Sequence, residues 1–134
     1  MKIDDLRERY ASIARLNLLP ETFTATVENI EEREDAKFPG YDALYIRAKI
    51  TDKEVVQSVN GDTVIQKFRP MHVTELLVPA MEKLGIRDTK DLMGKTFIFT
   101  AQSPSFGGSN PRWVPVGVPN GKQVRGKSTK KSAN

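Results

Sequence analysis

The segment 102–113 holds the residues of this chain whose types and spacing best suit ligand binding. It joins the last two predicted strands and carries Phe106, Arg112 and Trp113 among glycines and prolines. Glycine and proline set the backbone of a loop, but they give no reason for the loop to expose aromatic rings. An aromatic ring beside a cation can stack a nucleobase and hold a phosphate. The alternative is a loop that folds back and buries both rings.

The valine pattern after this loop predicts the direction in which Trp113 points. Side chains alternate between the two faces of a strand. In 113–118 the three valines therefore share one face, and Trp113 lies on the other. If the valines belong to the core, the indole points away from it. We therefore predict an exposed Trp113 that can stack a base.

Residues that could carry catalysis or bind a metal are few and scattered. The chain has one histidine, His72, and no cysteine, which excludes disulfides and thiolate metal sites. Asp88 and Asp91 suit helix caps and turns better than an acid–base pair, and the acidic run 31–35 suits a solvated strand end better than a cation site. The glycines at 107–108 lack the lysine and hydroxyl residue of a phosphate-binding loop. We therefore expect no catalytic activity, no metal and no cofactor.

Length and composition predict one soluble domain. A chain of 134 residues has the typical size of a single domain with one core. No apolar run approaches the roughly 18 residues that a membrane helix needs, and the acidic first residues are not those of a signal peptide. The absence of cysteine fits a reducing compartment. We expect a cytoplasmic protein without membrane contact.

The net charge of +4 is distributed unevenly along the chain. Residues 1–36 carry −4, residues 37–120 carry +3 and residues 121–134 carry +5. A tail rich in glycine, serine and lysine cannot bury enough apolar surface to fold, so we expect 120–134 to be disordered. Such a tail can bind nucleic acid non-specifically or only improve solubility, and both possibilities stay open.

Hydrophobic periodicity predicts an amphipathic helix over 3–19. Apolar residues recur there at steps of three and four, and Pro20 ends the pattern. The resulting apolar stripe must pack either on its own domain or on a second copy of the chain. From residue 21 the period changes to two, which is typical of strands. The predicted elements are strands at 21–33 and 43–51, a hairpin over 55–68 about Asn60-Gly61, a helix at 71–85 and strands at 95–101 and 113–118.

The predicted hairpin raises a question of register. A two-residue turn at Asn60-Gly61 would direct Lys67 and Arg69 into the core, where charged groups are costly. A β-bulge near residues 51–52, or an equivalent shift, would return both cations to the face of strand two that carries Arg47. We predict that shift, with Phe68 pointing inward. Pro79 also fits poorly inside the helix 71–85, so its regular part is expected to begin near Val78.

The order of these elements is helix, three strands, helix and two strands. It resembles that of OB-fold single-stranded DNA-binding proteins, including the replication protein A group. The resemblance covers about residues 21–119 and includes the Leu92-Met93-Gly94-Lys95 segment before strand four and the Pro111-Arg112-Trp113-Val114-Pro115-Val116 segment of strand five. The basic tail differs from the acidic C-terminal tail of bacterial members, so recruitment of partners by the tail is not expected.

The resemblance implies a mainly β fold, namely a five-stranded Greek-key OB barrel with a helix between strands 3 and 4. The N-terminal helix, within 1–20, would pack on the barrel or on a partner, 21–119 would form the OB domain, and 120–134 would be the tail. OB-folds bind strands of nucleic acid across strands two and three and the flanking loops. The residues of this chain in those regions are Lys37, Phe38, Tyr45, Arg47, Lys49, Lys67, Arg69, Phe106, Arg112 and Trp113.

The predicted function is therefore sequence-tolerant binding of single-stranded DNA, or of RNA, in replication or repair. Basic side chains would follow the phosphates while the aromatic rings stack bases. Phe38 could equally plug one end of the barrel. The alternative function is an OB-fold assembly module, in which the helix 3–19 forms a homodimer or docks a protein partner. The sequence does not decide between these functions, nor between DNA and RNA.

Overall fold

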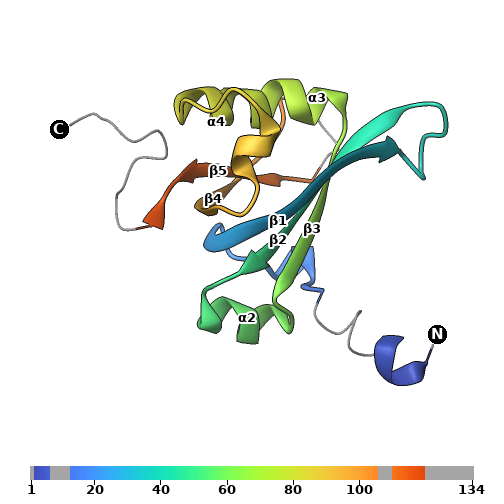
Figure 1. The fold of residues 1–134 in the computed structure, drawn as a ribbon, viewed down its shortest axis with the longest axis vertical. Helices are drawn as coiled ribbons and strands as arrows, with labels where there is room; N and C mark the ends of the chain where they lie inside the picture. Colours follow the sequence, from blue (N-terminus) through green and yellow to red (C-terminus); the bar gives the residue numbers. More distant parts are fainter. Residues whose placement is uncertain (1, 7–12, 106–109, 120–134) are drawn as a thin grey trace.

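The protein is mainly β and is built around one five-stranded antiparallel sheet (Figure 1). The computed structural model describes residues 2–6, 13–105 and 110–119. The strands follow the order β3-β2-β1-β4-β5 in the sheet, and helical segments lie between β3 and β4 as predicted. The bounds of the strands are β1 Thr22–Glu34, β2 Asp42–Ile50, β3 Thr63–Phe68, β4 Thr96–Gln102 and β5 Arg112–Gly117.

One continuous helical segment connects β3 to β4. It consists of α3 (Pro70–His72), the π-helical turn η2 (Val73–Leu77) and α4 (Val78–Lys83), and a short 3-10 helix, η3 (Thr89–Leu92), follows. Proline lacks an N–H and crowds the preceding turn, so an α-helix does not tolerate it in its interior. The π turn ends where α4 begins, which places Pro79 in the first turn of α4, as predicted. Gly85, at φ 75°, follows the end of the segment.

The predicted hairpin over 55–68 is wrong. Residues Lys53–Val59 form a helix, α2, and a carboxylate oxygen of Asp52 caps it by accepting hydrogen bonds from the backbone N–H groups of Glu54 and Val55 at 3.1 and 3.4 Å. Asn60, at φ 57°, ends α2 in the left-handed conformation. The Asn-Gly pair therefore serves as a helix C-cap rather than as a hairpin turn.

The helix α2 also settles the register of β3. Lys67 pairs with Tyr45 and Phe68 pairs with Leu44, so Lys67 returns to the β2 face that carries Tyr45 while Phe68 is fully buried. This is the predicted orientation, but it arises from the helical connection and not from a bulge at 51–52. The register shift in β1 lies instead between Val27 and Asn29.

The N-terminal segment is not one helix over 3–19. Residues 3–6 are helical, but Ile13 forms a parallel bridge with Thr63 and the Ala14 N–H donates to the Thr63 carbonyl at 2.7 Å. A 3-10 turn, η1 (Leu16–Leu18), follows. A Cβ at Gly61 would lie 2.8 Å from the carbonyl carbon of Ile13, so a glycine there allows the segment to approach β3 closely. The segment from residue 13 is thus held by backbone contacts with β3.

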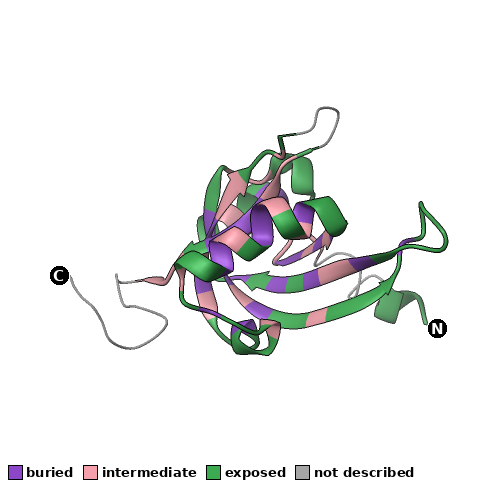
Figure 2. Ribbon diagram, turned by 90° about the horizontal axis from the view of Figure 1, so that it is seen from above, coloured by how far each residue is buried: buried purple, intermediate pink, exposed green. Residues whose placement is uncertain are grey.

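The core lies between the sheet and the helical segment 70–83, whose buried residues gather at the centre of the molecule in Figure 2. Beyond it, residues 31–34 of β1 are exposed and form a ribbon with β2. Among the described residues, no helix is long and apolar enough to span a membrane. The largest side chains of the core include Phe23, Phe68, Leu77, Leu92, Phe97, Phe99 and Trp113.

The prediction of an exposed Trp113 is wrong. Its side chain is 8% exposed, its indole N–H donates to the Pro20 carbonyl at 2.9 Å, and its ring lies 6.4 Å from that of Phe23. The valine alternation fails because the register between β4 and β5 shifts at Val116, which is 44% exposed. The edge strand β5 is also covered by the segment before β1, so Trp113 is buried on the side where solvent was expected.

Candidate functional site

A groove of about 650 Å³ lies between the segment 16–19, strand β3 and strand β5. Leu16, Leu19, Ile65 and the ring of Tyr45 give it apolar walls, and the wall at β5 includes Trp113. Charged and amide groups also line the groove. They are Asn17, Gln66, Lys67, Asn110 and Arg112. A concave, mainly apolar site with a few polar groups is the usual form of a ligand pocket.

Gln66 links the two outer strands of the sheet below this groove. Its amide oxygen accepts a hydrogen bond from the Trp113 N–H at 2.8 Å, and its amide nitrogen donates to the Trp113 carbonyl at 2.9 Å. Arg112 Nε donates to the Lys67 carbonyl at 2.6 Å. Side chains therefore hold β3 beside β5, and the groove depends on these contacts.

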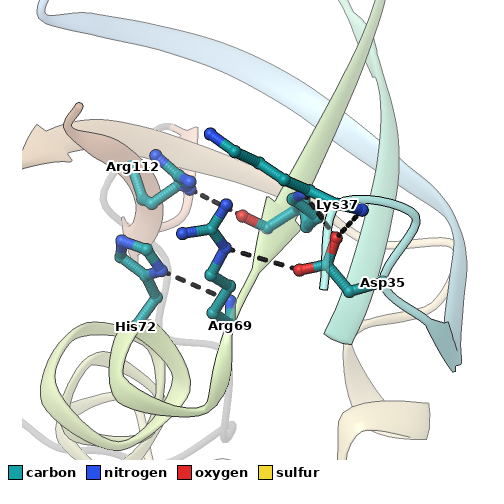
Figure 3. A network of polar contacts seen from close by, with 6 residues as sticks. Asp35, Lys37, Arg69, His72 and Arg112 are labelled. Atoms are coloured by element: carbon teal, nitrogen blue, oxygen red, sulfur yellow. Dashed lines mark hydrogen bonds and ion pairs between the residues drawn. The ribbon is translucent and has the colours of Figure 1, made fainter. Parts of the chain in front are cut away.

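A buried carboxylate, Asp35, organises the cations next to the groove (Figure 3). Asp35 is 2% exposed, and its Oδ1 accepts hydrogen bonds from Lys67 Nζ at 2.8 Å and from the Lys37 N–H at 2.9 Å. Its Oδ2 lies 3.4 Å from Arg69 Nε. The hydrogen bond from Lys67 lowers the pKa of Asp35, with the Lys37 N–H and the charges of Lys67 and Arg69 adding to it against the effect of burial. Asp35 is therefore ionised at neutral pH.

Arg112 is fixed in a partly buried position at the start of β5. Its Nη1 donates to the carbonyls of Asn110 and Pro111 at 2.9 and 3.3 Å. Burial and the charge of Arg69 lower its pKa. His72 Nδ1 accepts a hydrogen bond from the Arg69 N–H at 3.3 Å, and burial followed by the charges of Arg112 and Arg69 lowers the pKa of His72. His72 is therefore a neutral, buried side chain at neutral pH.

Two aromatic rings of the predicted site carry stacked guanidinium groups. Arg33 Cζ lies 3.9 Å from the centroid of the Tyr45 ring, and Arg69 Cζ lies 4.3 Å from that of Phe38. Arg33 is also paired with Glu31 at 3.4 Å. Phe38 is 43% exposed, so it does not plug the core.

The remaining predicted cations lie outside the groove. Arg47 Nε is 3.4 Å from Glu28 Oε1, and Lys49 Nζ is 3.9 Å from Asp62 Oδ2. Both basic side chains are about half exposed and have their own acidic partner. Phe106 lies outside the described residues. The structure thus brings Tyr45, Lys67, Arg112 and Trp113 to the groove, Lys37, Phe38 and Arg69 to its neighbouring loop, and leaves Arg47 and Lys49 apart.

Sequence reasoning missed several residues that shape this site. The role of Gln66 could have been found from the sequence. It lies two residues from both Val64 and Phe68 and so shares the inward face of β3 with them, where an amide must find buried partners. The role of Asp35 could not, since its partner Lys67 is distant in sequence. Among the described residues, no group of three or more histidine, aspartate or glutamate side chains could hold a metal ion. The chain matches no protein-family model and no curated protein.

Proposed function

We propose that this protein binds single-stranded nucleic acid with little sequence preference and that a nucleotide occupies the groove. The observation that carries the proposal is the groove itself, which joins an aromatic ring and aliphatic walls to two cations, Lys67 and Arg112. A single strand needs both kinds of contact, since its bases gain from stacking on apolar surfaces and its phosphates from positive charge.

The fold that we propose is an OB barrel. In that fold, strands β3 and β5 close the sheet, and the ligand lies across β2, β3 and the adjoining loops. The strand order and the contacts of Gln66 with Trp113 support this proposal. Tyr45 lies on β2 and Ile65 on β3, the strands on which OB-fold single-stranded DNA-binding proteins bind the bases.

A tolerant rather than selective site follows from the polar groups of the groove. Base identity is read by hydrogen bonds to base edges, whereas stacking accepts any base. The amide oxygen and nitrogen of Gln66 are both engaged by the backbone of Trp113. Of the amides that line the groove, Asn17 and Asn110 remain to contact a base. These groups favour a sequence-tolerant site. The resemblance to single-stranded DNA-binding proteins favours DNA as the ligand, and the same titration with an RNA oligonucleotide measures the alternative.

Replacing Tyr45 with alanine tests the proposal. Loss of one stacked base costs roughly 1–3 kcal/mol, so the affinity for a fluorescent oligo-dT is expected to fall roughly 5- to 150-fold in an anisotropy titration. Tyr41→Ala is the matched control, because Tyr41 is 69% exposed on the nearby loop and does not line the groove. Equal affinity of the Tyr45 and Tyr41 variants would contradict a nucleotide in the groove.

The tail 120–134 needs a separate control because it is basic. Binding in the groove predicts that a chain without 120–134 keeps a reduced but salt-sensitive affinity for oligo-dT. Binding by the tail alone predicts that this affinity disappears. The fluorescence of Trp113, the single tryptophan of the chain, reports on the groove wall in the same titration.

The second candidate function is assembly through the N-terminal segment. Ile3, Leu6, Leu16 and Leu18 are 71%, 40%, 39% and 47% exposed, which is an unusual amount of apolar surface for one short segment. A homodimer or a protein partner could cover it. Sedimentation of the wild type and of Leu18→Asp tests the homodimer. An interface between two copies predicts a wild-type dimer that the aspartate dissociates, and a monomeric wild type would contradict it.

A further inference from the structure

The two guanidinium groups beside the groove lie close together with little negative charge near them. Arg69 follows β3, Arg112 begins β5, and Figure 3 shows their guanidinium groups near one another and near His72. Lys67 and Arg69 contact the carboxylate of Asp35, and Arg112 lies near Arg69, so three cations gather beside one carboxylate. The other acid near His72, Glu75, accepts two hydrogen bonds from Ser105, at 2.7 and 3.2 Å. Partly buried like charges repel one another, so an added anion would stabilise this cluster.

Both guanidinium groups are held in place by the protein. Main-chain carbonyls engage Nε and Nη1 of Arg112. Arg69 stacks on Phe38 and has its Nε 3.4 Å from Asp35 Oδ2. Among the described residues, these contacts leave Nη2 of Arg112 and both Nη atoms of Arg69 to meet a ligand. Both side chains are therefore ordered before a ligand binds, which lowers the entropic cost of binding.

We propose that Arg69 and Arg112 together bind one phosphodiester of the nucleic-acid strand, next to the nucleotide in the groove. This inference rests on the proposed function. Arg69 keeps both Nη groups, so it can present parallel N–H groups that match two phosphate oxygens, which a lysine cannot do, and Arg112 adds its Nη2. The subsite is continuous with the groove, because Arg112 belongs to both and donates a hydrogen bond to the carbonyl of Lys67, which lines the groove. Asp35 acts as a positioning residue that holds Arg69 and Lys67 and does not touch the strand.

The salt dependence of oligo-dT binding tests this subsite. Each neutralised phosphate contributes about one unit to the slope of log affinity against log salt concentration. Because Arg69 and Arg112 bind the same phosphodiester, Arg69→Gln and Arg112→Gln should each lower that slope measurably, and the double variant should lower it by about 1. Arg47→Gln is the matched control, since Arg47 is exposed, is paired with Glu28 and lies outside the groove. Its slope should stay within a fraction of a unit of the wild-type slope. Thermal unfolding verifies that each variant is folded.

The outcomes separate this inference from the proposed function. Salt-sensitive wild-type binding with unchanged slopes for Arg69→Gln and Arg112→Gln would overturn the phosphate subsite and leave the groove as the binding site. Wild-type protein that does not bind oligo-dT would overturn both. If Arg112→Gln does not fold, then Arg112→Lys and Arg69→Gln decide. Arg112→Lys keeps the charge but loses the main-chain contacts that hold Nη2 in place, so its slope should persist while its affinity falls several-fold.

Discussion

Two groups of cations that look alike in sequence differ in their surroundings. Arg47 and Lys49 on β2 are about half exposed, and each lies beside its own acid. Lys67, Arg69 and Arg112 are partly buried around the ends of β3 and β5; Lys67 and Arg69 share the carboxylate of Asp35, and Arg112 is held by main-chain carbonyls instead. Exposed pairs are screened by salt and water, whereas partly buried charges act over a less screened path. The second group is therefore the better anion site.

This difference shows why the number of basic residues on a face does not locate a binding site. What matters is the balance between each cation and its nearest acid, together with burial beside an apolar surface. In the exposed group each cation is neutralised by its own acid, and neither cation lines the groove. The buried group has the groove, and its positive charge exceeds its negative charge.

The largest effect on stability is expected from removal of the Trp113 side chain, which forms the groove wall beside Arg112. Trp113→Ala empties a buried site on β5 beside Arg112 and should cost roughly 3–5 kcal/mol of unfolding free energy. Urea unfolding measures the loss. The variant should also lose oligo-dT affinity, because the groove loses its wall. A change of less than about 1 kcal/mol would contradict the burial of Trp113.

A smaller loss of unfolding free energy is expected from removal of the Gln66 side chain, which joins β3 to β5. Gln66→Ala leaves the N–H and the carbonyl of Trp113 without their partner, at a total cost of roughly 1–3 kcal/mol of unfolding free energy. Gln57→Ala, at an exposed position of α2, is the control and should change the unfolding free energy by less than about 0.5 kcal/mol. Equal stability of the two variants would show that the link between the outer strands does not depend on Gln66.

The smallest effect is the pH dependence of stability that comes from Asp35. Its pKa lies below the ordinary 3.8 in the folded protein, so its stabilising effect is present above that pH and is lost as pH falls through the folded value. Asp35→Asn should therefore remove part of the acid destabilisation seen by urea unfolding below pH 3.8. Asp62→Asn, which removes the exposed partner of Lys49, provides the comparison. A steeper acid loss in Asp35→Asn than in the wild type would contradict this assignment.

Much of the fold could be predicted because it follows from local periodicity. Alternating residues predict β1, β2 and β4, and Pro79 indicates where α4 begins. The segment 53–59 could not be assigned in the same way, since Asn60-Gly61 suits both a hairpin turn and a helix C-cap. Tertiary contacts decide between them, because Val59 is fully buried and Gly61 lies against Ile13.

The site was predictable only in part for a related reason. Tyr45, Lys67 and Arg112 could be placed by strand order, whereas the burial of Trp113 could not, because its outward face is covered by the segment around Pro20, which is distant in sequence. The role of Asp35 depends on its contact with Lys67 across two strands. Charge balance of this kind is a property of the folded chain.

Photo-crosslinking tests the central claim most directly, since it locates the strand on the protein. Oligo-dT in which thymine is replaced by 5-iodouracil forms adducts with nearby aromatic rings, and mass spectrometry identifies the attached peptide. Binding in the groove predicts an adduct on Tyr45, which lines it, and none on Tyr41, which is more exposed but lies outside it. Adducts on Tyr41 or within 120–134, with Tyr45 unmodified, would contradict the account.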